Sequence, residues 1–430
     1  MNSREAALKV LYDVDVNSAY INSSFNSIVN ETELDLKDKA LLSEIVYGVI
    51  KNKLKIDYVI KSFSKVKLKK ISPWVLNILR SGIYQILFLE RIPDSAACNE
   101  CVKLAKKYSN KGGVGFVNGL LRSVSRSKDE IQFPEYKDGV IEYFSVKYSF
   151  PEWLVKKLIV QYGEEKAERF MAESNTAHGT DVRVNTLKTT LKELSQIFSE
   201  KDIKHTISEK AQNIITVNAN INLTMLCEYK EGLFSLQNSS SKRAIDVLAP
   251  RTGDFVIDLC AAPGGKSCAA AELMENKGEI LSFDLYEHKK ALIENSANRL
   301  GIDIIKVGVG DASYLNNDLI KKADRVIVDA PCSGIGVIHK KPDIKWKRNE
   351  EDISELKDIQ LRILNNAAEY VKPGGVLLYS TCTVLKEENE DNIREFLNNN
   401  TSFIVEHEEQ ILTDKAGESG FYICKMVMKG

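Results

Sequence analysis

The stretch Asp258-Leu259-Cys260-Ala261-Ala262-Pro263-Gly264-Gly265-Lys266 joins a short apolar strand candidate, residues 255–259, to a helix-forming segment. Its adjacent glycines let the backbone approach a bound ligand, and the first turn of the following helix presents free N–H groups. The stretch lacks the Gly-x-Gly-x-x-Gly pattern of a dinucleotide site. Gly265-Lys266-Ser267 matches the end of an ATPase phosphate loop, but the first glycine of that loop would fall at Cys260. We therefore expect a ligand-binding loop of another kind.

Strands and helices alternate outward from this loop across residues 239–430. The short apolar strand candidates cover residues 255–259, 279–283, 304–309, 323–328 and 376–380. Residues 420–426 predict a further, antiparallel strand at the edge of the same sheet. Repeated strand and helix units predict a doubly wound, mainly parallel α/β sheet of the Rossmann-like kind, with ligands bound beyond the carboxyl ends of its strands.

Three aspartates stand at the ends of successive strand candidates, namely Asp284, Asp311 and Asp329. A single aspartate after a strand more often caps a helix or forms a turn. Three of them in register with the glycine loop favour a binding site instead. A carboxylate at the end of the second strand can accept both hydroxyls of a ribose, which is the role we expect for Asp284.

Two cysteines also close strands in this region: Cys332 in Asp329-Ala330-Pro331-Cys332-Ser333-Gly334 and Cys382 in Ser380-Thr381-Cys382-Thr383. A thiolate can add to the electron-poor C6 of cytosine and turn C5 into a carbon nucleophile that accepts a methyl group. A second thiol then has a use when the product is released. The pair points to covalent chemistry on a pyrimidine ring. We expect the other cysteines of this half to be small buried hydrophobes, namely Cys227, Cys260, Cys268 and Cys424.

Together, the three segments resemble the cytosine-5 RNA methyltransferases, which use S-adenosylmethionine as cofactor. The resemblance implies that the loop binds this cofactor through Cys260, Ala261, Ala262, Pro263, Gly264, Gly265 and Lys266. It implies that Asp311 contacts the adenine amino group and that Asp329 lies between the cofactor and the N3 edge of the target cytosine. Cys382 would be the nucleophile, and Cys332 would assist release of the methylated base. Lys266 would support the pocket electrostatically.

The front of the chain reads as all helical, with apolar residues at three- and four-residue spacing. The expected helices cover residues 4–16, 37–51, 53–63, 73–89, 94–108 and 115–126. The segment resembles the NusB-type RNA-binding domains through runs such as Arg4-Glu5-Ala6-Ala7-Leu8, Leu79-Arg80-Ser81-Gly82-Ile83 and Gly115-Phe116-Val117-Asn118-Gly119. With this segment the resemblance spans nearly the whole chain. It implies the 16S ribosomal RNA cytosine-5 methyltransferases of the RsmB (Sun/Fmu) family.

The expected domains differ in charge. They are a NusB-like helical RNA-binding domain at 1–128, a linker at 129–144, a small α+β domain at 145–238 and the methyltransferase domain at 239–430. Residues 1–128 hold 21 Lys and Arg against 12 Asp and Glu, or +9, and the remaining residues hold 38 against 48, or -10. A chance excess of lysines on solvated helix faces is the alternative. We expect the basic front half to contribute much of the attraction to RNA.

A lysine-rich loop follows Cys332. The run His339-Lys340-Lys341-Pro342-Asp343-Ile344-Lys345-Trp346-Lys347 holds four lysines and a tryptophan, which suits phosphate contacts and base stacking. An ordinary solvated loop anchored by Trp346 is the alternative. We favour RNA contact because the loop leaves the catalytic face.

Composition places the chain among globular proteins, with 43% hydrophobic and 28% charged residues. No apolar run reaches membrane-spanning length and the start lacks the apolar core of a signal peptide, so we expect a cytoplasmic protein with reduced cysteines and no membrane partner. Cys98-Asn99-Glu100-Cys101 has the spacing of zinc ligands, but no second pair follows, and we expect no metal. We expect a monomer whose partner is small-subunit ribosomal RNA.

Two other functions fit parts of the pattern. An antitermination-like RNA-binding protein would keep the helical front and have an inactive C-terminal domain. An enzyme of the same chemistry could instead act on transfer RNA or on 23S ribosomal RNA. The complete loop, the two cysteines and the three aspartates favour an active enzyme. The target nucleotide depends on RNA structure and loop shape, which the sequence does not specify.

Overall fold

A computed structural model describes residues 1–219, 221–413 and 417–430. Their contacts divide the chain into two compact units. The helical unit consists of residues 1–175 and 340–347, and the sheet unit consists of residues 176–339 and 348–430. Within the described ranges, no helix is both long and apolar enough to cross a membrane.

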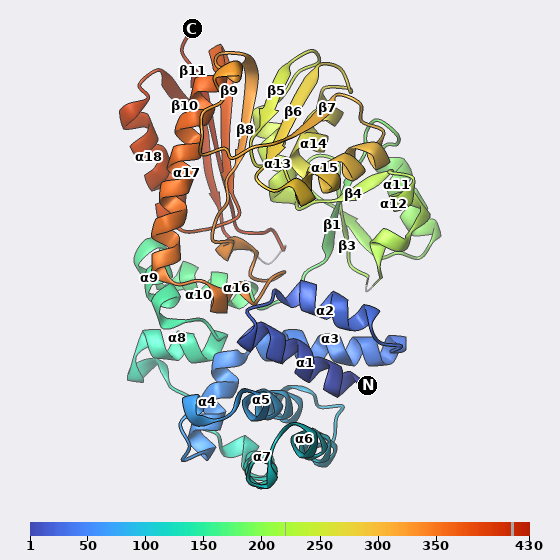
Figure 1. The fold of residues 1–430 in the computed structure, drawn as a ribbon, viewed down its shortest axis with the longest axis vertical. Helices are drawn as coiled ribbons and strands as arrows, with labels where there is room; N and C mark the ends of the chain where they lie inside the picture. The colour runs from blue at the N-terminus through green and yellow to red at the C-terminus, as the bar shows by residue number, and fades with distance from the viewer. Residues whose placement is uncertain (220, 414–416) are drawn as a thin grey trace. The chain divides into compact units, whose positions relative to one another are not determined.

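The helical unit begins with helices that share one apolar core (Figure 1). They are α1 (Ser3–Val16), α2 (Ile21–Asn30), α3 (Leu36–Lys51), α4 (Lys53–Phe63), α5 (Pro73–Phe88), α6 (Asp94–Tyr108) and α7 (Lys111–Arg126). Side-chain oxygens of Asn2, Asp35 and Asn110 cap α1, α3 and α7. Apolar spacing predicts all of these helices except α2, in which six of ten residues are Asn or Ser.

The remaining helices of this unit come from two separate parts of the chain. Residues 127–175 contribute α8 (Val140–Tyr148), α9 (Glu152–Tyr162) and α10 (Glu164–Glu173). Short 3-10 turns accompany them at η1 (Leu68–Lys70), η2 (Lys128–Glu130) and η3 (Tyr136–Asp138). The last helix, α16 (Ile344–Lys347), lies far along the sequence within residues 340–347, which we call the strap.

The strap is anchored in the helical unit by a buried lysine. Lys345 is fully buried, and its Nζ donates to the carbonyl oxygen of Lys51, 3.0 Å away, and to Asn175 Oδ1, 3.2 Å away. Burial lowers the pKa of this ammonium well below its ordinary value. The prediction that Lys345 contacts RNA is therefore wrong, because its amine end faces protein oxygens.

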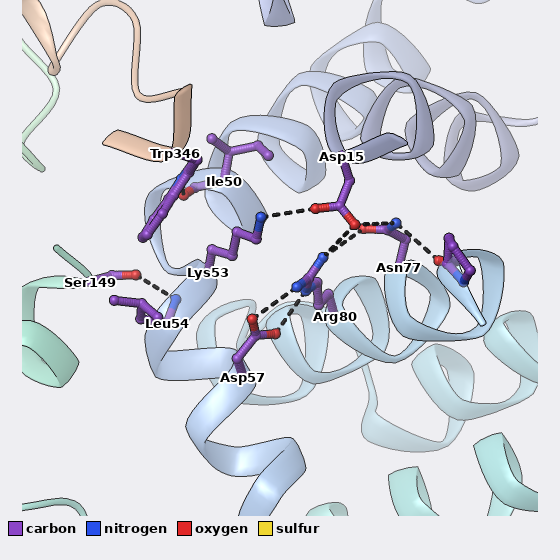
Figure 2. A network of polar contacts seen from close by, with 10 residues as sticks. Asp15, Ile50, Lys53, Leu54, Asp57, Asn77, Arg80, Ser149 and Trp346 are labelled. Atoms are coloured by element: carbon purple, nitrogen blue, oxygen red, sulfur yellow. Dashed lines mark hydrogen bonds and ion pairs between the residues drawn. The ribbon is translucent and has the colours of Figure 1, made fainter. Parts of the chain in front are cut away.

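The neighbouring residues of the strap add further anchors. Trp346 Nε1 donates to the carbonyl oxygen of Ile50, 2.9 Å away, as Figure 2 shows. Lys347 Nζ donates to the carbonyl oxygens of Ser18 and Ala19, at 3.1 and 2.7 Å. The tryptophan and this second lysine thus bind the helical unit, where we had expected base stacking and phosphate contacts.

A polar network ties three helices together beside the strap (Figure 2). Arg80 on α5 forms a bidentate pair with Asp57 on α4, with distances of 2.7 and 2.9 Å. The same guanidinium donates to Asp15 on α1, 3.0 Å away, and Lys53 lies 2.9 Å from that carboxylate. Bidentate bonds fix the geometry of both partners, so the network sets how α1, α4 and α5 pack.

The sheet unit begins with a small antiparallel sheet in the order β2-β3-β1-β4. Its strands are β1 (Thr180–Val184), β2 (His205–Ile207), β3 (Ile214–Val217) and β4 (Phe234–Leu236). The helical elements here are α11 (Leu191–Glu200), η4 (Leu223–Met225) and α12 (Cys227–Lys230). Phe198 and Phe234 pack edge to face in its core.

A larger sheet follows, in the order β10-β11-β9-β8-β5-β6-β7 (Figure 1). Its strands are β5 (Phe255–Asp258), β6 (Glu279–Asp284), β7 (Ile305–Val309), β8 (Ala323–Asp329), β9 (Val371–Thr381), β10 (Phe403–Ile411) and β11 (Phe421–Met428). The strands from β9 to β7 pair in parallel, as predicted. The prediction of an edge strand at 420–426 is wrong: β11 lies antiparallel between β9 and β10, and β10 forms the edge.

Helices cover both faces of this sheet. They are α13 (Ser239–Leu248), α14 (Gly265–Leu273), α15 (Glu287–Leu300), α17 (Glu350–Tyr370) and α18 (Glu390–Asn399), with 3-10 turns η5 (Asn317–Leu319), η6 (Ile335–Val337) and η7 (Lys386–Glu388). Alternate strand residues point into different cores, so Val328 packs with α17 and α18 while Ile327 packs with α13, α14 and α15.

A buried ion pair joins the small sheet to α14, a helix that packs on the larger sheet. Arg183 on β1 has no exposed surface and forms a bidentate pair with Glu272 on α14, at 3.0 and 2.9 Å. Its remaining nitrogen donates to the carbonyl oxygen of Gly265, 2.7 Å away, and also contacts Gln237. The small sheet therefore holds the first turn of α14 in place.

We predict that Arg183→Met lowers the free energy of unfolding by about 3–5 kcal/mol, because removal of one partner leaves Glu272 charged and buried. Urea unfolding followed by circular dichroism measures this loss. Lys306→Met is the matched control, since the pair of Lys306 with Glu279 is exposed and should contribute about 1 kcal/mol or less. Equal losses in the two variants would contradict the importance of the buried pair.

Candidate active site

The loop after β5 turns tightly into α14. The N–H of Ala261 donates to the carbonyl oxygen of Phe283 on β6, 2.8 Å away, and the N–H of Gly264 donates to the carbonyl oxygen of Ala261, 2.6 Å away. Gly264 has a φ of +96°, and a Cβ there would lie 3.2 Å from the backbone of Ile293. A side chain at Gly264 would be both strained and crowded, so this turn requires glycine.

A cavity of about 330 Å³ lies at the carboxyl ends of the parallel strands. Predicted site residues from four strand ends line it: Cys260, Ala262, Asp284, Asp311 and Asp329. The other lining residues are Leu259, Leu285, Tyr286, Lys289, Gly310, Ala312, Pro331, Ile359 and Ile363. The cavity combines carboxylates with aliphatic and aromatic walls.

Asp284 is the most buried of the three aspartates. It accepts from the backbone N–H of Ala262, 3.2 Å away, and lies 3.1 Å from Lys289 Nζ. Asp311 is exposed and accepts from the backbone N–H and the hydroxyl of Ser313. Asp284 thus joins the loop after β5 to the end of β6, while Asp311 is open to solvent.

Asp329 lies at the junction of the cavity and the cysteine loops. Lys266 Nζ lies 2.6 Å from its Oδ2, and the hydroxyl of Ser380 donates to its Oδ1, 3.0 Å away. Lys266 is largely buried, but 34% of the Asp329 side chain is exposed, so water screens this ion pair in part. Lys266, which the sequence predicts as an electrostatic support of the pocket, thus contacts Asp329.

The rest of the predicted loop lies outside the cavity wall, among the residues that the structure describes: Ala261, Pro263, Gly264, Gly265 and Lys266. Ser267, next in the chain, is fully buried and donates to Asp258 Oδ2, 2.6 Å away. A phosphate loop needs this hydroxyl at a metal ion, so the geometry opposes the ATPase alternative. Burial raises the pKa of Asp258 to about 7.

Sequence reasoning missed the side wall of the cavity. Tyr286 and Lys289 follow Asp284 closely in the sequence, and that proximity was a usable signal. Ile359 and Ile363 come from α17 and are four residues apart. This spacing is typical of core packing, so no sequence feature separated them from core residues.

The two predicted cysteines meet at the ends of neighbouring strands. β8 and β9 pair in parallel with Asp329 opposite Ser380, so the loops that follow them begin side by side. The Sγ atoms of Cys332 and Cys382 lie 3.1 Å apart, and the backbone N–H of Cys382 points at Cys332 Sγ, 3.3 Å away. The two thiols are therefore in direct contact and can share a proton.

The contact affects the ionisation of Cys332. Its pKa is raised well above the ordinary thiol value, first by the hydrogen bond to Cys382 and then by burial. Cys332 therefore keeps its proton in this arrangement and can donate it to the sulfur of Cys382.

The other cysteines differ from one another in burial. Cys268 and Cys424 are buried, as expected, and Cys260 is half-buried in the cavity wall. The expectation for Cys227 is wrong, because it is exposed at the start of the short helix α12. Among the described residues, no three or more His, Cys, Asp and Glu side chains are grouped so that they could hold a metal ion.

Comparison with family models divides the chain into three matched parts. Residues 1–126 match the NusB family, and residues 150–224 match the ferredoxin-like domain of RsmF/B-like methyltransferases. Residues 245–425 match the 16S rRNA methyltransferase RsmB/F. These matches confirm the expected fold class, with a NusB-like helical front, a small α+β region and a Rossmann-like methyltransferase sheet.

Similar proteins align with the chain over most of their length. A Bacillus subtilis protein named "probable ribosomal RNA small subunit methyltransferase B" is 37% identical over 99% of both chains. The Proteus mirabilis ribosomal RNA small subunit methyltransferase B is 31% identical over 93% of both. Among solved structures, PH0851 is 28% identical with a TM-score of 0.84 over 99% of both chains. A methyltransferase homolog from Pyrococcus horikoshii is 27% identical with a TM-score of 0.59, over 67% of this chain and 99% of its own.

We predict that iodoacetamide labels Cys332 more slowly than the exposed Cys227 at pH 7. A raised pKa leaves less of the reactive thiolate at any pH below that pKa. Cys382→Ala removes the largest cause of the raised pKa, so labelling of Cys332 should become faster at the same pH. Peptide mass spectrometry at timed intervals gives the rates, with Cys227 as the internal reference. Labelling of Cys332 at one rate in both proteins would refute the proposed sharing of the proton.

Proposed function

Because the chain belongs to the ribosomal RNA small subunit methyltransferase B family, we propose that it transfers the methyl group of S-adenosylmethionine to C5 of a cytosine in 16S ribosomal RNA. The observation that carries the cytosine-5 assignment is the 3.1 Å contact between Cys332 and Cys382. The loop with Cys332 continues directly from the cavity-lining residues Asp329 and Pro331. A cofactor in the cavity would then lie next to the thiols.

The cavity residues fit S-adenosylmethionine. The carboxylates of Asp284, Asp311 and Asp329 suit a ligand with cationic groups and ribose hydroxyls, and Ile359 and Ile363 suit an adenine ring. When bound, the cofactor supplies a methyl group already activated by a positively charged sulfur. Asp284 would hold the ribose hydroxyls, and Asp311 would accept from the adenine amino group.

Cys382 acts as the nucleophile in this proposal. Its thiolate forms a bond with C6 of the cytosine, and C5 then accepts the methyl group, whose bond to the donor sulfur breaks and leaves S-adenosylhomocysteine as the co-product. Loss of the C5 proton to solvent and cleavage of the bond between C6 and sulfur restore the ring, and the electron pair returns to Cys382. Cys332 assists this release because its proton lies next to the departing sulfur.

Asp329 and Lys266 would stabilise the attacked base. Addition at C6 places negative charge on the ring, and part of this charge reaches N3. The Lys266 ammonium lies 2.6 Å from Asp329, so the pair can offer positive charge and a shared proton near that edge. Burial of Lys266 strengthens this interaction relative to one in water.

Methyl transfer with matched cysteine variants tests the function. We predict that the parent protein methylates 16S ribosomal RNA and that bisulfite sequencing locates the product at cytosine. Cys382→Ala should lose turnover and keep cofactor affinity, because this thiol bonds the base. Cys332→Ala should accumulate a protein–RNA adduct that survives boiling in detergent, because attack continues while release slows. Calorimetry with S-adenosylmethionine checks the cofactor site of both variants.

The same experiment separates the alternatives. Methylation of transfer RNA or 23S ribosomal RNA in place of 16S RNA would change the substrate and keep the chemistry. RNA binding without methyl transfer to any of these RNAs would favour an antitermination-like binding protein. Clear residual methylation by Cys382→Ala would remove Cys382 from the nucleophile role, and normal turnover by Cys332→Ala would refute its role in release.

Asp284→Ala should weaken S-adenosylmethionine about tenfold or more, because a charge-assisted hydrogen bond contributes roughly 1.5–3 kcal/mol. RNA affinity should change little. Asp303→Ala serves as the control, since Asp303 is an exposed aspartate of the same unit. Titration calorimetry gives both dissociation constants. An unchanged cofactor affinity in Asp284→Ala would contradict the ribose assignment.

The helical unit supplies a basic surface that fits the proposed RNA substrate. Lys65, Lys67, Lys69 and Lys70 are exposed around the η1 turn, and none of them forms an ion pair within the described part of the chain. Charges without a nearby opposite charge are available to phosphates. A hollow of about 360 Å³ next to Lys70 is bordered by Ser72 and Phe116.

Replacement of these four lysines by glutamine should weaken RNA binding and reduce the slope of log affinity against log salt. Each lost phosphate contact lowers that slope by about 0.7 to 0.9 units. The control replaces four exposed lysines of the sheet unit and so has the same net charge: Lys192, Lys306, Lys321 and Lys322. Binding assays at several salt concentrations give the slopes. Equal slopes in the two variants would mean that net charge, and no particular surface, controls binding.

A further inference from the structure

A buried carboxylate lies beneath the loop that carries Cys332. Glu388, at the end of η7, has no exposed surface. It accepts from the backbone N–H of Ser333, 2.8 Å away, from the Ser333 hydroxyl, and from Gln360 Nε2, 2.9 Å away. The same Gln360 nitrogen donates to the carbonyl oxygen of Pro331, 2.9 Å away. Glu388 thus holds the residues on both sides of Cys332, one directly and one through Gln360.

The next residue in the chain holds the Cys382 loop in the same way. The Thr381 hydroxyl donates to Asn389 Oδ1, 2.6 Å away, and Asn389 Nδ2 donates to the carbonyl oxygen of Thr383, 3.2 Å away. These are the two residues on either side of Cys382. Asn389 is fully buried as well, and its amide also donates to Gln410.

The two loops are also joined to each other. The hydroxyls of Ser333 and Thr383, one residue beyond each cysteine, lie 2.8 Å apart. Glu388 and Asn389 are adjacent in the chain, so the single peptide unit between them keeps their backbones at a nearly fixed distance. The contacts of this pair therefore fix the separation of the two cysteine loops.

The hydrogen bonds to Glu388 favour an ionised carboxylate, whereas its burial raises the pKa of the group. All its partners are donors, and a carboxylate accepts without donating. In a glutamine at this position, the NH2 group would replace one carboxylate oxygen. It would then face an N–H or O–H donor of Ser333 or Gln360, and that hydrogen bond would be lost. No basic side chain pairs with Glu388 among the residues described, so the hydrogen bonds that favour its ionised form come from neutral donors alone. A buried charge without a counter-ion is costly, and such groups are concentrated at functional sites.

We propose that Glu388 and Asn389 are positioning residues, which hold the Cys332 and Cys382 loops at the separation that attack and release require. This inference rests on the proposed two-thiol reaction for its catalytic meaning. Neither residue lines the cavity or contacts a sulfur in the described structure, so each acts through its neighbours. A reacting group displaced by about 1 Å can slow an enzyme by about a hundredfold.

Oxidative trapping measures the separation of the thiols without RNA or cofactor. Diamide accepts two electrons and two protons from a pair of thiols, which become a disulfide while the azo group becomes a hydrazine. The rate depends on how often the two sulfurs are in contact. Samples taken at timed intervals are alkylated, and mass spectrometry measures how much Cys332 and Cys382 still reacts. The decrease with time gives the rate of disulfide formation. The exposed Cys227 reports the general reactivity of the reagent.

Glu388→Gln is the principal variant, and Asp391→Asn is its matched control. Asp391 lies in the first turn of α18, and its side chain pairs with the exposed Arg394 of the same helix. We expect trapping and kcat to fall about tenfold or more in Glu388→Gln, with cofactor affinity and the KM for RNA near those of the parent. Asp391→Asn should behave as the parent. A general loss of structure would instead weaken the cofactor together with turnover.

Trapping at the parent rate in folded Glu388→Gln would overturn the proposal. Ser333→Ala removes one of the three hydrogen bonds to Glu388 and should slow trapping by a smaller factor, about threefold. If Glu388→Gln does not fold, Ser333→Ala alone decides, and a parent-like rate overturns the proposal. The two claims can also fail separately. If the variants trap slowly but the parent protein methylates no RNA, the positioning role stands and the proposed function is refuted.

Discussion

The parallel register of β8 and β9 is the constraint on which the site depends. Asp329 lies opposite Ser380. Two hydrogen bonds join the strand ends there: the N–H of Ala330 donates to the carbonyl oxygen of Ser380, and the hydroxyl of Ser380 donates to Asp329. A shift of one residue would turn one set of side chains to the opposite face of the sheet. The register therefore brings together the aspartate beside the cavity and the two thiols, which are 50 residues apart in the sequence.

Buried polar groups hold the loops at these strand ends in place through hydrogen bonds. Arg183 holds α14 at both ends, through the Gly265 carbonyl and the Glu272 carboxylate, and Glu388 with Asn389 fixes the two loops after β8 and β9. Such groups contribute little net stability compared with apolar packing, but each accepts only one geometry of its partners. The apolar cores on the two faces hold the sheet together, while the polar contacts determine where its loop ends lie.

The sequence allowed much of the sheet and of the site to be predicted, for physical reasons. Apolar runs ending in Asp284, Asp311 and Asp329 mark strand ends, and parallel strands bring such ends together. The position of β11 between β9 and β10 was not predictable, because strand order depends on pairing between distant segments. Glu388 was missed because an acidic residue in a polar run is usually exposed. The strap was misread for a similar reason, since four lysines rarely indicate burial.

The strap also affects the order in which the protein can fold during synthesis. Residues 1–175 leave the ribosome long before residues 340–347, yet Lys345 and Lys51 are bonded across 294 positions of sequence. The helical unit is therefore incomplete until more than three quarters of the chain has been made. Until then, the carbonyl groups of Ile50 and Lys51 lack their hydrogen-bond donors from the strap. Long-range contacts of this kind form slowly. A nascent chain stalled before the strap would expose this gap to chaperones and proteases.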